Sequence, residues 1–87
     1  MPLDQQEILR RLTLVFRDVL DQDDLVLNRD TTARAVDGWD SLAHVRLMVA
    51  TEAEFRIRLG TAEIESLKNV GDLVDSIASK VATSPTV

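Results

Sequence analysis

Apolar residues recur at helical spacing near the start of the chain. Between residues 4 and 20 they come at steps of one, three and four, which is typical of a helix with one buried face. Asp4 and Glu7 have the spacing of a capping box, with Asp in the place of Ser or Thr. The pattern predicts an amphipathic helix from about Asp4 to Leu20. Its apolar positions are Ile8, Leu9, Leu12, Val15, Phe16, Val19 and Leu20.

No period is sustained from residue 21 to residue 40, where Asp, Asn, Thr and Gly are frequent. We expect a long loop, and loops of this length in small domains are usually functional or packed. Asp21, Asp23 and Asp24 weakly resemble the start of a calcium loop, but Leu25 and Val26 replace the next ligand and the required glycine. The sequence therefore argues against calcium. The apolar candidates to hold the loop against the core are Leu25, Val26, Leu27, Ala33, Ala35 and Val36.

The second helical pattern, from about Ser41 to Phe55, carries apolar residues on two sides. One stripe consists of Leu47, Thr51 and Phe55, flanked by Met48 and Ala50. The other, nearly opposite, consists of Leu42, Val45, Val49 and Ala53. A surface helix of a bundle needs only one apolar stripe for its core. Two interpretations stay open: a central helix buried on both sides, or a second stripe that docks another protein.

The remainder of the chain predicts one short helix and one long helix. Gly60 ends the second pattern, and residues 61–66 could form a short helix with Ile64 and Leu67 pointing inward. Asn69 is a candidate N-cap, because Asp72 follows three residues later. The apolar positions Val70, Leu73, Val74, Ile77, Ala78 and Val81 then predict an amphipathic helix from about Val70 to Val81. We expect residues 82–87 to form a frayed tail.

These patterns predict an all-α fold: a small four-helix bundle of three long helices and one short helix, with the long loop between the first two. A chain of 87 residues has the size of one domain. We expect a single domain over residues 1–87, ordered from about residue 4 to residue 81. The sequence has no cysteine, so its own side chains provide neither disulfides nor thiol chemistry.

The charge and the hydropathy pattern limit the partners. The net charge of −5 argues against nucleic-acid binding and suggests partners with basic patches. We find no pattern of a signal peptide and no apolar run that approaches a membrane span. We therefore expect a cytoplasmic monomer that binds neither nucleic acid nor membrane.

The main candidate for chemistry is the segment Asp37-Gly38-Trp39-Asp40-Ser41-Leu42, where the loop meets the second helix. Asp37 or Asp40 could cap this helix, and Gly38 permits a sharp turn. Ser41 then falls in the first turn, where backbone N–H groups lack intrahelical partners and the helix dipole favours an anion. A hydroxyl there is well placed to carry a phosphate ester. The alternative is that Ser41 only caps the helix.

His44, the only histidine, lies three residues after Ser41. A Ser-His-Asp hydrolase with Asp37 or Asp40 is conceivable, since residues three apart on a helix are neighbours. However, the chain has no Gly-x-Ser-x-Gly turn and no visible source of an oxyanion hole. His44 also fits no recognised spacing of metal ligands. We expect it to project near the side of Thr51 and Phe55 and to have a packing or hydrogen-bonding role.

Trp39 is the only tryptophan and comes just before Asp40 and Ser41. One interpretation is that its ring packs the loop against the bundle. The other is that it shapes the surface around whatever Ser41 carries. The sequence alone favours the packing role.

The tripeptide Asp40-Ser41-Leu42 at the start of a long second helix, with Phe55 near its end, resembles the acyl carrier proteins. The order of long helix, long loop, helix, short helix and last helix is also similar, over about residues 8–77. The resemblance implies that Ser41 receives 4′-phosphopantetheine from coenzyme A through a phosphopantetheinyl transferase. The thiol of that arm would carry an acyl group as a thioester from a loading enzyme to an accepting enzyme. The protein itself would be a carrier and not an enzyme.

The resemblance also implies a surface for partner enzymes beside Ser41. We expect it to contain Asp40, Leu42, Val45, Arg46, Val49 and Glu52. Fatty-acid carriers usually have a strongly acidic second helix, whereas His44 and Arg46 occupy its early turns here. This departure argues against housekeeping fatty-acid synthesis. The segment Gly38-Trp39-Asp40-Ser41-Leu42 is more similar to stand-alone carriers of polyketide or hybrid specialised metabolism. An aminoacyl or peptidyl carrier is one alternative, although those usually have Gly or His in the place of Asp40. An unmodified helical interaction module is the other alternative.

Overall fold

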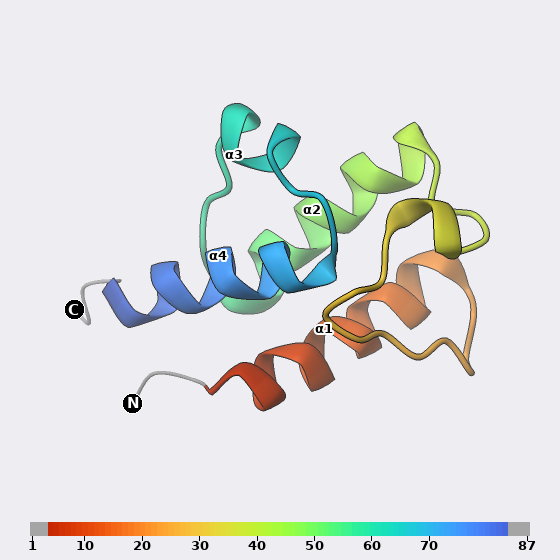
Figure 1. Cartoon of the computed structure of the whole chain (residues 1–87), viewed down its shortest axis with the longest axis horizontal. Helices are drawn as coiled ribbons and strands as arrows, with labels where there is room; N and C mark the ends of the chain where they lie inside the picture. The colour runs from red at the N-terminus through yellow and green to blue at the C-terminus, as the bar shows by residue number, and fades with distance from the viewer. Residues whose placement is uncertain (1–3, 84–87) are drawn as a thin grey trace.

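The computed structural model describes residues 4–83, and within this range the chain forms four α-helices and one short 3-10 turn. Their bounds are α1 Gln5–Leu20, η1 Ala33–Ala35, α2 Ser41–Phe55, α3 Thr61–Glu65 and α4 Val70–Thr83. Helix α1 packs against both α2 and α4, and the short α3 lies above α4 in the view of Figure 1. The predicted all-α bundle of three long helices and one short helix is confirmed.

Helix α1 begins and ends through local hydrogen bonds. The Asp4 side chain accepts from the backbone N–H of Glu7 at 2.7 Å, as the predicted cap requires. The Glu7 carboxylate does not complete the capping box, because it accepts two hydrogen bonds from Arg10, at 2.7 and 2.9 Å. These bonds hold the pKa of Glu7 below its usual value. The helix ends at Asp21, which adopts the left-handed conformation with φ 54°.

The core lies between α1, α2 and α4. Every third or fourth residue of α1 points into it, so that Ile8, Leu12 and Phe16 are fully buried. Phe55 is buried in the same cluster, as predicted. The guanidinium of Arg11 lies 5.0 Å from the centroid of the Phe55 ring. The other core residues are Leu27, Leu47, Met48, Ile57, Leu59, Val70, Leu73, Val74 and Ile77.

The loop between α1 and α2 is anchored by fewer side chains than the sequence suggested. Leu27 is buried and Leu25 is half-buried, whereas Val26 is 72% exposed, because neighbouring side chains in a non-helical segment point to opposite sides. The expectation that Ala33 and Ala35 help to pin the loop is wrong, since both are exposed on η1. Val36, which follows η1, is buried as predicted.

Backbone groups, rather than side chains, hold the middle of this loop. The carbonyls of Arg29 and Thr31 accept from the N–H groups of Gly71 and Val70, both at 2.8 Å. The loop thereby satisfies two of the amides that a helix N-terminus leaves unpaired. The Asn69 side chain accepts from the N–H of Asp72 at 2.8 Å, which confirms the predicted N-cap of α4.

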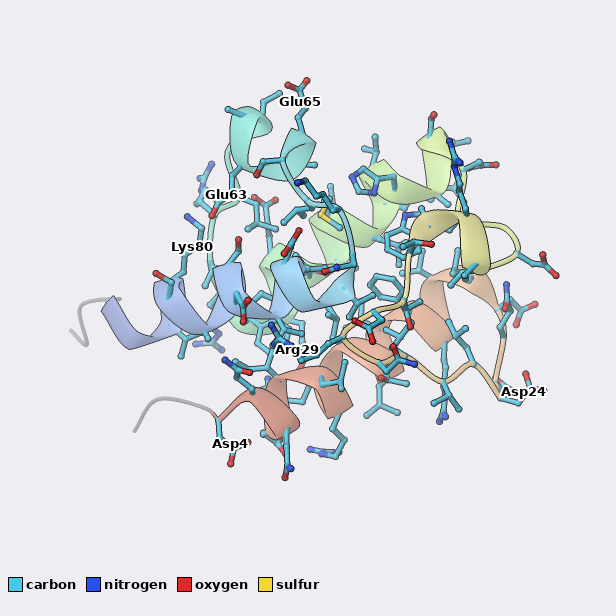
Figure 2. The ribbon with its side chains drawn as sticks, viewed as in Figure 1. Asp4, Asp24, Arg29, Glu63, Glu65 and Lys80 are labelled. Atoms are coloured by element: carbon cyan, nitrogen blue, oxygen red, sulfur yellow. The ribbon has the colours of Figure 1, made fainter. Side chains whose placement is uncertain are left out.

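The side chain of Arg29 ties the loop to two helices at once (Figure 2). Its guanidinium donates to Gln5 of α1 at 3.0 Å and to both carboxylate oxygens of Asp75 of α4, at 2.8 and 3.1 Å. These bonds lower the pKa of Asp75. A second ion pair, between Glu63 and Lys80 at 3.0 Å, joins α3 to α4.

The C-terminal part agrees with the prediction except at the helix ends. Helix α3 stops at Glu65, one residue before the expected Ser66, and α4 continues to Thr83, past the expected end at Val81. Part of the predicted frayed tail, residues 84–87, lies outside the described residues. Ile64 and Leu67 pack against the core as predicted. Within residues 4–83 no helix is long and apolar enough to cross a membrane, and no cluster of three potential metal ligands occurs.

Replacing Phe55 by Ala should lower the free energy of unfolding by about 3–5 kcal/mol, the usual cost of removing a buried aromatic ring. Typical domains have a total stability of only about 5–15 kcal/mol, so the variant should be marginally folded. Urea denaturation followed by circular dichroism would measure the change. Leu42→Ala is the control, because Leu42 is 65% exposed and its loss should hardly change stability. A Phe55 variant as stable as the parent would contradict the helix packing described above.

Gly71→Ala should destabilise the protein although Ala is the better helix former. A Cβ atom at residue 71 would lie 2.9 Å from the carbonyl oxygen and 3.1 Å from the Cβ of Arg29. Overpacking of this kind costs about 1–3 kcal/mol, against a propensity gain of about 0.5–1 kcal/mol. We expect a net loss of about 1 kcal/mol in urea denaturation. Gly60→Ala is the matched control, because a Cβ there meets nothing within 4 Å. A more stable Gly71→Ala variant would refute the close contact between loop and helix.

Candidate functional site

The turn that leads into α2 is fixed by Gly38 and Gln22. Gly38 has φ +83°, a backbone conformation that residues other than glycine rarely adopt. The Gln22 side-chain amide donates to the carbonyl of Asp37 at 2.6 Å, and the N–H of Trp39 donates to the carbonyl of Val36 at 3.3 Å. Gln22, two residues after the end of α1, thus holds the turn that precedes the candidate serine.

Asp40, and not Asp37, caps α2. Its carboxylate accepts from the backbone N–H of Ala43 at 2.8 Å, and its carbonyl accepts from the N–H of His44 at 2.8 Å. Ser41 is therefore the first helical residue, as the sequence predicted. The N–H groups of Ser41 and Leu42 precede the first amide that reaches an intrahelical carbonyl, so both are available to an anion.

The hydroxyl of Ser41 is exposed and makes no hydrogen bond within the part of the chain that the structure describes. Other hydroxyls behave differently. Those of Thr13, Thr51 and Ser66 donate to carbonyls of Leu9, Leu47 and Glu63, at 2.8, 2.7 and 2.8 Å. Thr51 is also completely buried, as predicted. Ser41 therefore differs from these hydroxyls in being both exposed and uncommitted.

An open hollow of about 360 Å³ lies beside Ser41. Its wall is formed by Ala33 of η1, by Trp39 and Asp40 of the turn, and by Ser41 and His44 of α2. The contribution of Ala33 could not be predicted from the sequence, because it depends on the loop folding back over the start of α2. The hollow leaves room for a substituent on the serine oxygen.

Trp39 and His44 form the rigid part of this wall. The indole N–H of Trp39 donates to Nδ1 of His44 at 3.0 Å, and the two rings stack with centroids 6.0 Å apart. The Trp39 ring also meets Phe16 edge to face at 4.9 Å, a favourable arrangement of aromatic pairs. Both expectations are confirmed: Trp39 packs the loop onto the bundle, and His44 accepts a hydrogen bond.

The same hydrogen bond argues against a hydrolase. Because Nδ1 of His44 accepts the hydrogen bond from the Trp39 indole, the proton of the imidazole lies on Nε2. Neither nitrogen then offers a lone pair to Ser41, as a general base must. No hydrogen bond joins Ser41 to His44 among the described residues, and the Asp40 carboxylate accepts from the backbone of Ala43 instead. The catalytic triad considered from the sequence is not assembled.

The two apolar stripes of α2 have different environments. Leu47, Met48, Thr51 and Phe55 are buried. On the opposite side Leu42, Val45 and Val49 are 65%, 59% and 60% exposed, and Ala53 is also exposed. The interpretation that both stripes are buried is therefore wrong, because α2 has neighbouring helices on one side only. We call the residues Leu42, Val45 and Val49 the outer stripe.

Two charged residues near the outer stripe, Glu52 and Arg46, have different environments. Glu52, expected from the sequence as a partner contact, accepts from the backbone N–H of Leu59 at 2.7 Å and so stabilises the chain after α2. Arg46 is exposed and borders a second hollow of about 220 Å³, between α2 and the end of α1. Val19, Leu20, Gly38, Asp40, Leu42 and Ala43 complete its lining.

Comparison with known proteins gives a consistent set of relatives. An acyl carrier protein of Thermosynechococcus vestitus is 36% identical over 81 residues, which are 92% of this chain and 99% of that protein. One from Acidothermus cellulolyticus is 31% identical over 84 residues, or 97% of this chain and 100% of its own length. No family model matches the chain.

The fold has a relative of known structure. The solution structure of a holo acyl carrier protein from Geobacter metallireducens superimposes with a TM-score of 0.81 and 46% sequence identity. The match covers 85% of each of the two chains. At this identity the likeness includes sequence as well as helix arrangement.

His44→Phe should lower the free energy of unfolding by about 1 kcal/mol, the usual net value of one hydrogen bond. Phe retains a flat ring to stack on Trp39 but removes the acceptor of its N–H. Urea denaturation would measure the change, and a fluorophosphonate probe would test the hydroxyl of Ser41 in both proteins. We expect no labelling of Ser41 in either protein. Labelling of Ser41 in the parent that disappears in His44→Phe would support the hydrolase hypothesis after all.

Proposed function

The chain belongs to the acyl carrier protein family, and from this premise we propose that Ser41 is the residue to which its 4′-phosphopantetheine is attached. Members of this family are carriers and not enzymes. The observation that carries the proposal is the position of Ser41: an exposed and uncommitted hydroxyl in the first turn of a 15-residue helix.

The residues around Ser41 fit a phosphodiester. The free N–H groups of Ser41 and Leu42 and the dipole of α2 favour its negative charge. The hollow of about 360 Å³ provides space for the start of the arm. The carboxylate of Asp40 opposes the charge of the phosphate, although one of its oxygens already accepts from Ala43. We therefore assign Asp40 to the transferase reaction, where a metal ion would offset its charge, rather than to the finished arm.

The absence of cysteine from the sequence indicates which chemistry the cofactor has to supply. The sequence contains no cysteine, so the reactive thiol that holds the acyl group as a thioester has to come from phosphopantetheine. The chain itself holds Ser41 at a fixed point. Asp40 fixes the start of the helix, and the contact of Trp39 with Phe16 fixes the turn against α1.

The outer stripe is the proposed contact surface for the transferase and for the enzymes that load and accept the acyl group. It begins one residue after Ser41 and follows the exposed side of α2. Exposed apolar side chains in a row are typical of a protein-binding surface. A partner bound there would lie close to the attached arm.

We further propose that the carrier serves specialised metabolism, of the polyketide or hybrid kind, rather than general fatty-acid synthesis. The support is the weakly acidic character of α2, whose early turns carry His44 and Arg46 rather than carboxylates. The carboxylates of Glu52 and Glu54 are engaged by Leu59 and Arg11 within the chain. An intact mass of the protein from its native source would identify the acyl group that it carries.

Ser41→Ala should abolish modification and leave the fold intact. The parent protein, incubated with coenzyme A and a broad-specificity phosphopantetheinyl transferase, should gain one phosphopantetheinyl group in an intact-mass measurement. The variant should gain none, because within residues 4–83 no other hydroxyl offers the same exposure in the first turn of a long helix. Circular dichroism should show equal helix content in both proteins.

The matched control is Ser66→Ala, which removes a serine hydroxyl that is committed to the carbonyl of Glu63. This variant should be modified as fast as the parent. Modification of Ser41→Ala would show that the attachment residue is a different one. A parent protein that stays inert with several transferases would reject the proposal and favour an unmodified interaction module.

A further inference from the structure

We infer that the partner surface that meets α2 is apolar and carries a carboxylate opposite Arg46. The inference rests on the proposed carrier function and adds the chemistry of the partner. It reverses the expectation from the net charge of −5, which on its own suggests partners with basic patches. Four observations on α2 lead to it.

First, the outer stripe is apolar and exposed. Leu42, Val45 and Val49 leave 65%, 59% and 60% of their surfaces in contact with solvent, among the largest exposures of big apolar side chains in the described chain. Covering them removes apolar surface from water, which is the main favourable contribution in most protein associations. The centre of the partner surface is therefore expected to be apolar.

Second, the acidic groups of α2 are already engaged within the chain. The carboxylate of Asp40 accepts from Ala43 at 2.8 Å, and that of Glu52 accepts from Leu59 at 2.7 Å. The carboxylate of Glu54 accepts from Arg11 at 2.6 and 2.9 Å. A basic side chain of a partner would have to compete with these bonds, so α2 offers it little.

Third, Arg46 has no such engagement. Its side chain is exposed, and the structure records neither an ion pair nor a hydrogen bond for its guanidinium within residues 4–83. It lies one residue after Val45, at the border of the hollow of about 220 Å³ that also contains Val19 and Leu20. A partner that fills this hollow would therefore place its own side chains next to the guanidinium.

Fourth, covering Arg46 without a counter-charge is unfavourable. A cation that loses its water needs an anion that accepts its hydrogen bonds. A cation buried without such an anion weakens the complex strongly. Guanidinium and carboxylate form two parallel hydrogen bonds, which makes a carboxylate the best match. A lysine or arginine at the same place would be repelled. Among partners whose apolar surfaces all fit the outer stripe, Arg46 thus favours those with a carboxylate opposite it.

Two synthetic peptides provide a defined probe. Both are held helical by an internal staple and have the same apolar stripe, and they differ only in one residue beside it, Glu in one and Lys in the other. The protein, labelled with ¹⁵N, is titrated with each peptide at low salt. We expect the Glu peptide to bind at least tenfold more tightly and to shift the amide signals of Leu42, Val45 and Val49. The preference should decrease at high salt, where charges are screened.

Three variants show whether Arg46 is the cause. Arg46→Glu should reverse the preference, and Arg46→Lys should keep its direction. Arg58→Glu is the matched control: it changes the net charge equally, at an exposed residue beyond the end of α2, and should leave the preference unchanged. Val45→Asp should lower the affinity for both peptides by the same factor, provided that circular dichroism shows an unchanged helix content.

Equal affinity for the two peptides, a tighter Lys peptide, or no shift of the outer-stripe amides by either peptide would overturn the inference. A dimer in sedimentation velocity that dissociates in Val45→Asp would also overturn it, because the stripe would then be covered by a second copy of the chain. The same preparation is tested for modification of Ser41 by mass. Modification without peptide preference rejects only this inference, whereas failure of modification rejects the carrier function itself.

Discussion

The arrangement of this small protein depends on how the loop between α1 and α2 satisfies its backbone groups. A chain segment without regular structure has to find hydrogen-bond donors for its carbonyls. Here the carbonyls of Arg29 and Thr31 accept from the first backbone N–H groups of α4. One set of hydrogen bonds thus completes a helix N-terminus and fixes the loop. Since the same loop continues into the turn before Ser41, the position of the serine is determined by contacts far from it in the sequence.

The two sides of helix α2 have opposite environments. Its inner side is closed by Leu47, Thr51 and Phe55, while its outer side leaves large apolar side chains in water. A free-standing protein gains nothing in stability from such exposure, and the proposed contact with partner enzymes would account for it. The start of the helix shows the same division, because Asp40 is occupied by its cap and Ser41 remains free.

Most of the helices and the candidate serine could be predicted from local sequence, because periodicity and capping residues act over a few positions. What the sequence left open depended on distant residues. From the sequence Asp37 and Asp40 were equally good caps. Only the structure shows that the Asp40 carboxylate accepts from Ala43, while Gln22 of the loop binds the carbonyl of Asp37. Glu52 appeared free for a partner, but the chain returns after α2 and places the N–H of Leu59 beside it. The tightest contacts that a Cβ at residue 71 would make are with the distant Arg29, so nothing in the local sequence indicated them.

The contact of Trp39 with His44 has a consequence for spectroscopy. The sequence contains one tryptophan and no tyrosine, so nearly all absorption at the red edge of the near-ultraviolet and nearly all emission come from a single ring. That ring forms a wall of the hollow beside Ser41 and stacks on an imidazole. The intrinsic fluorescence of the whole protein is therefore a local signal from the hollow beside Ser41, and it reports on events there without any added label.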